Sequence, residues 1–377
     1  MDENNAQNST SEIQVPILGG NNDRWRRNTS GWSPGGTLSF RNASKKWWGK
    51  YGTNLQNQPD KLRRIYYADE GKLLVQPDQS GAEALIVSYL GPAGTYRQLF
   101  QYGINPHCHL GLHLFTNYWQ DNTPHDARFL TTLSIPDLAS NPEWPKLAKV
   151  IKSSDGWESK KRFYYFSKKT GHAHNYDMRA NTFQLSILKE SGGEVCLTKH
   201  QAEAFLEGRT SVLPEIPIWH NTVREQVKAT RCIRNLFGFP RWFNGPLNEK
   251  TFKDAYAQCP QSTVGCISNF AFVAVQKFIE DSGVNWDLLN NCHDSIMFQV
   301  PLDEVELAVK VAKAAMEMDL VAPDGTPFKM KSEVSVGFNW SKFSDSCINC
   351  KAHKDKCNCG KYQPENIDGM KEWKVAA

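Results

Sequence analysis

Two aspartates, each at one end of a short apolar strand, constrain this chain more than any other feature. Asp78 follows the apolar run 73–75 and precedes a segment, 83–90, that has the pattern of a buried helix. Asp294 stands in a polar turn before the apolar strand 296–300. Taken singly, one aspartate can cap a helix and the other can close a hairpin. If adjacent strands bring them side by side, the two carboxylates repel unless cations lie between them, which predicts a site for two Mg²⁺ ions.

The length and charge of the chain exclude several classes of protein. The chain has 377 residues, of which 40% are apolar and 22% charged, and this composition excludes collagen, a coiled coil and wholesale disorder. The 44 basic and 40 acidic residues nearly balance, so any site for a polyanion is local. Apolar runs such as 84–87 and 270–275 are far shorter than the roughly 20 residues of a membrane helix. Because residues 1–11 also lack an apolar signal core, we expect no membrane span and a cytoplasmic location.

The apolar pattern changes several times along the chain. Residues 1–33 have little periodicity and predict a loose leader, and residues 135–250 are mainly helical in pattern. Strands are predicted at 65–68, 72–76, 296–300 and 329–336, and long helices at 262–279 and 304–318. The sequence therefore alternates between strand-rich regions at both ends and a helical middle.

Three side chains in the helical middle form a chemically ordered row. Lys168, His172 and Tyr176 are spaced at i, i+4 and i+8, which places an ammonium, an imidazole and an aromatic ring on one helix face. A nucleoside triphosphate presents phosphates, a sugar and a base in the same order, and an aromatic ring can stack on a base. The alternative is an ordinary solvated basic helix, and Lys169 is the rival for the phosphate-binding role.

Short motifs around these residues recur in one order. Asp78 to Glu83, with the sequence DQSGAE, comes first, and His293-Asp294-Ser295 comes late. The others, in chain order, are Thr53 to Pro59 followed by Arg64, Asn105 to His107, His172 to Tyr176, Trp219-His220, Asn235 to Arg241, Pro260 to Thr263 and Gly337 to Trp340. This series resembles the motifs of the family A DNA polymerases, the bacterial polymerase I type, in their bacteriophage form. The resemblance spans residues 35 to 343.

The resemblance implies an α+β fold with two subdomains. A polymerase palm, an antiparallel sheet with packed helices, is expected together with a mainly helical fingers subdomain. The expected order is a loose N-terminal leader at 1–34, a first palm segment at 35–94, fingers at 95–245, a second palm segment at 246–345 and a Cys-rich C-terminal tail at 346–377. Only about 50 residues precede the Asn-Leu-Gln-Asn segment, so we expect a second polypeptide to supply the thumb or an exonuclease, as in a split polymerase. The alternative is a truncated chain that grips DNA weakly.

The resemblance also implies roles for single residues. Asp78 and Asp294 would hold two Mg²⁺ ions, Lys168 would draw in the triphosphate, and Glu83 would block a ribose 2′ hydroxyl. His172 and Tyr176, with Lys169 nearby, would contact the sugar and base of the dNTP. Primer-template DNA would be contacted by Asn54, Gln56, Asn57, Arg64, Arg241, Gln261 and His293.

These roles imply phage DNA replication in the cytoplasm of a host cell, with dNTPs and primer-template DNA as partners. A second hypothesis is a non-catalytic primer-template binding subunit that retains a degenerate polymerase fold. Both hypotheses keep the DNA contacts. They differ in whether a primer is extended in the presence of Mg²⁺ and dNTPs.

Several positions depart from the family pattern. Asp177 stands where the family has a glycine after the fingers tyrosine, and Tyr164 stands where a basic residue is usual. Thr37 replaces the arginine of an early Thr-Gly-Arg motif, and Ser295 replaces the glutamate of the third motif. Lys161, Arg162 and Arg41 are near enough in sequence to supply the missing positive charges.

A cysteine cluster lies near the C-terminus. Cys347, Cys350, Cys357 and Cys359 occur within 13 residues, and the first pair has the two-residue gap common in zinc sites. Four thiolates at this spacing predict a structural Zn²⁺ site. Free thiols are the alternative, and disulfides are less expected in a cytosolic chain.

Overall fold

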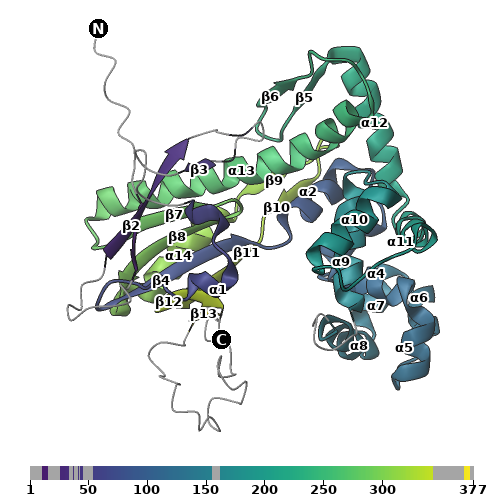
Figure 1. Cartoon of the computed structure of the whole chain (residues 1–377), viewed down its shortest axis with the longest axis horizontal. Coiled ribbons are helices and arrows are strands. Elements are labelled where there is room, and N and C mark those ends of the chain that lie inside the picture. Colours follow the sequence, from purple (N-terminus) through teal and green to yellow (C-terminus); the bar gives the residue numbers. More distant parts are fainter. Residues whose placement is uncertain are drawn as a thin grey trace. The chain divides into compact units, whose positions relative to one another are not determined.

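The computed structural model describes residues 11–15, 26–33, 37, 41, 43–45, 54–154, 162–342 and 369–373. The chain divides into two compact units (Figure 1). Unit 1 comprises residues 1–82, 261–321 and 327–377, and unit 2 comprises residues 83–260 and 322–326. The expected boundaries near 95 and 245 are therefore shifted to 82 and 260, because the flanking helices bury side chains such as Val87 and Tyr256 in the core of unit 2.

Unit 1 is built on a six-stranded sheet with the order β12-β13-β11-β4-β8-β7. The pairs β13–β11, β11–β4, β4–β8 and β8–β7 are antiparallel, and β12–β13 is parallel. The strands are β4 (Lys72–Gln79), β7 (Asp287–Cys292), β8 (Ser295–Pro301), β11 (Ser332–Gly337), β12 (Asn339–Lys342) and β13 (Gly369–Glu372). This largely antiparallel sheet, with helices packed on it, confirms the α+β class.

Further elements surround this sheet. A three-stranded sheet contains β1 (Ser11–Val15), β2 (Arg26–Ser33) and β3 (Ala43–Lys45), and a two-stranded one contains β9 (Asp319–Val321) and β10 (Pro327–Lys329). The helices are η1 (Leu55–Asn57), α1 (Asp60–Arg63), η3 (Leu302–Glu304), α14 (Val305–Met316) and the second half of α13 (Glu249–Ser282).

Strand β4 owes its place in the sheet to side chains that alternate between two faces. Leu74 is fully buried with Leu55 and Trp340 on one face. Gln79 is buried on the other face, where its amide donates to the Ser268 hydroxyl of α13 at 2.8 Å. A shift of β4 by one residue would exchange its two faces and put the polar Gln79 into the apolar cluster of Leu74, so the position of Asp78 in β4 is fixed.

Two expectations about the chain ends were partly wrong. The segment 1–34 is not simply a loose leader, because residues 11–15 and 26–33 pair as antiparallel strands. The tail is not wholly separate, because residues 369–373 include β13, which pairs with β11 and buries Met370. In both cases backbone hydrogen bonds form where the side-chain pattern gives no strand signal. The predicted strand 65–68 is also absent as a strand, and Tyr67 makes a single bridge to Asn339.

Unit 2 is a bundle of helices with one small hairpin. Its core contains several large aromatic side chains, among them Trp119, Trp144, Trp219 and Tyr256. The helices are α2 (Ala82–Leu90), α3 (Thr95–Gln101), α4 (Pro106–Leu114), α5 (Thr116–Asn122), α6 (Ala127–Thr132), α7 (Ile135–Ser140), α8 (Glu143–Lys152), α9 (Phe163–Asn175), α10 (Ala180–Glu190), α11 (Lys199–Val212), α12 (Glu215–Thr230) and the first half of α13, and the hairpin is β5 (Cys232–Arg234) with β6 (Pro240–Trp242).

Helix α13 is long and apolar enough, by length and composition, to cross a membrane. Half of its most apolar window is nevertheless buried within the protein, as is common for core helices. The expectation of no membrane span stays a prediction.

Candidate active site

The two aspartates lie at the ends of neighbouring strands of unit 1, Asp78 within β4 and Asp294 in the turn before β8. Asp78 is near the end of β4 and is paired in register with Ser295, the first residue of β8. Asp294 directly precedes Ser295, and its carbonyl accepts a hydrogen bond from the Gln79 amide at 3.1 Å. The side-by-side arrangement that the sequence predicts is thus present in the structure.

The ionised form of the Asp78 carboxyl group is unfavourable in its surroundings. Burial, the Asp294 carboxylate and the Glu333 carboxylate raise the pKa of Asp78 to about 7. Lys342 and Arg63 oppose this shift, but they do not cancel it. The Asp78 side chain still has exposed surface, so water and ions reach it. An exposed carboxylate with a raised pKa marks a place where a cation would relieve repulsion.

The metal that the resemblance implies is Mg²⁺, and the residues at this edge of the sheet fit it. Two neighbouring carboxylates with excess negative charge suit Mg²⁺, which binds proteins through one or two carboxylates and takes its other ligands from water and phosphates. Within the described ranges, no group of three or more His, Cys, Asp or Glu side chains is arranged to enclose a metal by itself.

Ser295, which stands where the resemblance implies a glutamate, offers no carboxylate to a metal, and its hydroxyl is bound by the protein. Its hydroxyl is buried, accepts a hydrogen bond from the Gln76 amide at 2.9 Å and donates to the Cys292 carbonyl at 3.2 Å. Gln76 in turn accepts from the Trp340 indole at 3.1 Å. The serine is therefore a member of a protein hydrogen-bond chain, where a longer carboxylate side chain would lose these partners.

Glu333 is a third acid that the sequence did not reveal. It is paired in register with Asp78 across β11 and β4, so both side chains leave the same face of the sheet. Its carboxylate accepts a hydrogen bond from the Ser80 hydroxyl at 2.6 Å. The sequence shows that Glu333 lies in a predicted strand. It does not show that this strand, β11, pairs with β4, so the position of Glu333 opposite Asp78 could not be predicted.

The fingers row is formed by α9 in unit 2. Lys168 and His172 are exposed on this helix, and Tyr176 caps its C-terminal end. The rings of His172 and Tyr176 contact edge to face, with centroids 5.1 Å apart. The Tyr176 hydroxyl donates to the carboxylate of Glu83 in the first turn of α2. Desolvation of the His172 ring by the protein atoms around it lowers the pKa of this imidazole, although part of the side chain stays exposed.

The structure separates the two rival lysines. Lys169 forms an ion pair with Glu190 at 2.6 Å. Among the residues that the structure describes, Lys168 has no ion-pair partner, and its side chain is exposed. An unpaired exposed ammonium is available to an anionic ligand, so Lys168 is the better candidate for the triphosphate.

Asp177 has a backbone conformation that glycine adopts without strain. Its φ is 53°, in the left-handed region that aspartate tolerates better than most other residues. Its carboxylate lies 3.6 Å from Arg224, which also forms a bidentate ion pair with Glu249. The departure at Asp177 therefore keeps the backbone conformation and adds a contact to α12.

The DNA-binding candidates of unit 1 differ in exposure and in their hydrogen-bond partners. Asn57 is exposed and its side-chain oxygen lies 3.4 Å from the His293 ring, and Arg64 is exposed on the turn after α1. Asn54 caps η1 by accepting the Gln56 amide at 3.1 Å. Gln56 itself is only 5% exposed and its amide binds protein backbone. A DNA contact through Gln56 would require those hydrogen bonds to be exchanged.

The remaining candidates belong to β6, α13 and the C-terminal tail. Arg241 in β6 donates to Gln258 at 3.0 Å and lies 3.7 Å from Asp254, so its guanidinium is held by protein. Gln261 is partly exposed in α13. The four tail cysteines lie outside the described residues, and the zinc prediction stays untested.

The other departures have local explanations. Tyr164 is buried and its ring packs against His107, so a charged side chain would be costly at this position. Arg162 pairs with Glu194 at 2.8 Å instead of being an unengaged basic residue. Thr37 hydrogen-bonds the backbone of Arg41, and Lys161 lies outside the described residues.

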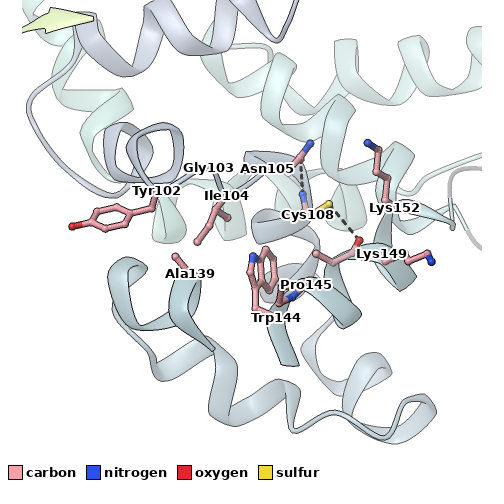
Figure 2. A pocket seen from close by; sticks show the side chains of 11 residues that line it. Tyr102, Gly103, Ile104, Asn105, Cys108, Ala139, Trp144, Pro145, Lys149 and Lys152 are labelled. Atoms are coloured by element: carbon pink, nitrogen blue, oxygen red, sulfur yellow. Dashed lines mark hydrogen bonds between the residues drawn. The ribbon is translucent and has the colours of Figure 1, made fainter. Parts of the chain in front are cut away.

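A pocket of about 420 Å³ in unit 2 lies apart from the fingers row. Figure 2 shows its lining, with Trp144, Pro145 and Ile104 at its apolar side and Lys149 and Lys152 at its rim. None of the fingers-row side chains or Glu83 lines it. Asn105, which the family resemblance places at the start of a fingers helix, caps α4 beside this pocket by accepting backbone amides at 2.9 and 3.0 Å.

Known proteins resemble this chain in sequence. The family model for DNA polymerase family A matches residues 180–342, a range that includes Asp294. The thermostable DNA polymerase I of Thermus aquaticus is 23% identical over 299 residues, which are 76% of this chain and 30% of that protein. DNA polymerase I of Treponema pallidum is 22% identical over 304 residues, or 77% of this chain and 25% of that protein. The chain thus spans less than a third of the length of these relatives.

A solved structure shares the fold. The POL domain of Pol1 from M. smegmatis, in complex with DNA primer-template and dNTP, has a TM-score of 0.60 at 17% identity. The similarity covers 83% of this chain and 48% of that one. Together, the family model, the relatives and the shared fold confirm that this chain resembles the family A DNA polymerases over their palm and fingers portion.

Proposed function

We propose that this chain is the palm and fingers module of a template-directed DNA polymerase that adds dNTPs to the 3′ end of a primer by a two-metal mechanism. The observation that carries the proposal is the pair formed by Asp78 and Asp294. Asp78 lies in β4 and Asp294 in the turn that leads into the adjacent strand β8, and their repulsion helps to raise the pKa of Asp78 to about 7. A fold that only bound DNA would gain stability by losing one of these acids.

Asp78 and Asp294 would hold the Mg²⁺ ions. When bound there, the ions would favour ionisation of the primer 3′ hydroxyl and stabilise the leaving pyrophosphate. The protein contributes the fixed spacing of the carboxylates, since β4 and β8 are hydrogen-bonded neighbours. Glu333, beside Asp78, adds negative charge that favours the cations.

The residues of α9 would receive the dNTP. Lys168 offers an ammonium to the phosphates, and the Tyr176 ring offers a stacking surface to the base. The hydrogen bond from Tyr176 holds the Glu83 carboxylate next to that ring. A carboxylate fixed in this place would occupy the space that a ribose 2′ hydroxyl needs, which favours deoxyribonucleotides.

Primer extension tests the proposal directly. The wild-type chain is expected to extend a labelled primer with Mg²⁺ and dNTPs, and Asp294→Ala is expected to abolish extension. Asp303→Ala removes an exposed acid of η3 and serves as the matched control. Equal extension by wild type and Asp294→Ala would refute the assignment. Duplex binding without incorporation by the wild type would support the non-catalytic binding subunit instead.

Other elements of the proposal concern context. A phage origin, a place in phage replication in the host cytoplasm, and a second polypeptide that supplies a thumb or exonuclease stay predictions. A separately purified polypeptide that binds this chain directly and raises its processivity in primer extension would support the second polypeptide. Zinc analysis of the purified chain, with and without the four tail cysteines, would test the Zn²⁺ site.

A further inference from the structure

Gln56 has an unusual position for a residue in a DNA-contacting segment. Its side chain is 5% exposed in the interior of unit 1. The side-chain Nε2 donates to the Asn291 carbonyl at 2.9 Å, and the Oε1 accepts from the Ser44 amide at 2.9 Å. Protein backbone therefore occupies both ends of the Gln56 amide. Buried polar groups that lose such partners destabilise a protein, so these bonds are expected to persist.

The Asn291 carbonyl belongs to an edge strand. Among the strands that the structure describes, β7 is the last in the order of the six-stranded sheet and pairs with β8 (Figure 1). An edge strand leaves backbone groups that need partners from outside the sheet. Gln56 supplies a donor to one of them. The Asn291 side chain reaches Asn269 of α13 at 3.5 Å, which is a weaker tie.

The edge matters because β7 leads into the turn with Asp294. His293 has a φ of 58°, so the turn contains a left-handed residue that is not glycine. From the interior of the sheet, the backbone N–H of Gln79 donates to the Asp294 carbonyl at 3.1 Å. From the outer edge, Gln56 holds the strand two residues before His293. The turn is thus fixed from two opposite sides.

We propose that Gln56 is a positioning residue for Asp294, which acts through the Asn291 carbonyl to fix the turn that carries this carboxylate. This role replaces the direct DNA contact that the sequence motif predicts for Gln56. The inference rests on the proposed function in one respect only, that Asp294 binds a divalent cation. It deepens that function by linking the Asn-Leu-Gln-Asn segment to the metal site.

Binding of Mn²⁺ to the DNA-free full-length chain tests the inference. Free Mn²⁺ is measured by electron paramagnetic resonance during titration of wild type, Gln56→Met, Gln58→Met and Asp294→Asn. Gln56→Met keeps the side-chain volume but removes both hydrogen bonds. Gln58→Met is the matched control, because the Gln58 amide donates to Asn54 within its own loop at 2.7 Å.

We expect Gln56→Met to raise the Mn²⁺ dissociation constant at least about fivefold, as a loosened carboxylate binds less well. Gln58→Met is expected to stay within twofold of wild type, and Asp294→Asn to lose the site. Amide hydrogen exchange of the peptide 287–300 should be faster in Gln56→Met and unchanged in Gln58→Met. If Gln56→Met does not fold by circular dichroism, Ser44→Ala is used, because it removes the hydroxyl that accepts the Leu55 amide at 3.1 Å and loosens the same contact.

Two results would overturn the inference. One is Mn²⁺ binding by the Gln56→Met chain equal to that of wild type, together with weaker primer-template binding in fluorescence anisotropy without metal, which would return Gln56 to a DNA contact. The other is Mn²⁺ binding that Asp294→Asn leaves unchanged. Failure of wild-type primer extension alone would refute the proposed function, whereas the Mn²⁺ and exchange results would still decide the role of Gln56.

Discussion

Asp294→Asn is expected to stabilise the metal-free protein at alkaline pH while it abolishes activity. The pKa of Asp78 is raised to about 7, with burial as the largest cause and the Asp294 charge second. The shift from the ordinary value of about 3.9 would correspond to at most about 4 kcal/mol for a fully buried group, at about 1.4 kcal/mol per pH unit. Water screens the exposed Asp78, and Asp294 is only one cause, so we assign about 1 kcal/mol to this repulsion.

The pH dependence gives this prediction its sign. Above pH 7, Asp78 is ionised in the folded chain and repels Asp294, so removal of the Asp294 charge stabilises the fold. As the pH falls through 7, Asp78 takes up a proton in the folded chain, and at pH 5 the repulsion is gone. Because the pKa of Asp78 is raised in the folded chain, the repulsion lowers the stability of the fold only at high pH. The gain in stability from Asp294→Asn therefore appears only at high pH.

Thermal unfolding in EDTA at pH 8 and pH 5 measures the effect. About 1 kcal/mol corresponds to a rise of about 2–4 °C in Tm at pH 8 for a folding unit of this size, and no rise is expected at pH 5. Asp303→Asn controls for the loss of a surface charge. Added Mg²⁺ should raise the Tm of wild type but not of Asp294→Asn. A loss of stability at pH 8, or an equal gain at both pH values, would refute the reasoning.

Three further outcomes follow from unit 2. Lys168→Ala is expected to lower kcat/KM for dNTPs by about 10–100-fold, from the loss of one charged hydrogen bond, while Lys169→Ala changes kcat/KM less than threefold in the same steady-state assay. Asp177→Ala should be less stable than Asp177→Gly by about 1 kcal/mol in urea unfolding, because only glycine adopts a φ of 53° freely. Glu83→Ala should raise the ratio of rNTP to dNTP incorporation at least about tenfold in single-nucleotide extension, and Tyr176→Phe, which loses only the hydrogen bond, should raise it less. Equal ratios in both variants would contradict the Glu83 role.

Local patterns in the sequence predicted most of the fold that surrounds the site. The apolar run before Asp78 and the alternation after Asp294 indicated both strands, because side chains of a strand report its faces directly. The long apolar pattern at 262–279 indicated the core of α13, although the helix extends in both directions to Glu249–Ser282. Helix ends depend on capping and on neighbouring elements, which the apolar pattern does not encode.

Long-range pairing could not be predicted from the sequence. Strand β13 joins the sheet from the end of the chain, and its register with β11 is set by backbone hydrogen bonds that any residue except proline can make. The same limit hid Glu333, whose importance depends on being opposite Asp78. Gln56 was assigned by motif to DNA, but its burial follows from the packing of η1 against β7, which no local pattern reports.

The departures from the family pattern share a physical feature that bears on activity. Ser295 and Asp177 are each engaged by side chains of their own unit, Gln76 and Arg224 respectively. When a site loses its function, a substituted residue is expected to leave the hydrogen-bond partners of the replaced side chain unsatisfied. Here the new residues have hydrogen-bonding or ionic partners, while Asp78 and Asp294 retain a repulsion that destabilises the fold without metal. Ser295 and Asp177 thus fit their surroundings, whereas the repulsion between Asp78 and Asp294 is not relieved by the protein. Stability alone gives no reason to keep this acid pair, so its presence favours a working polymerase site over a degenerate one.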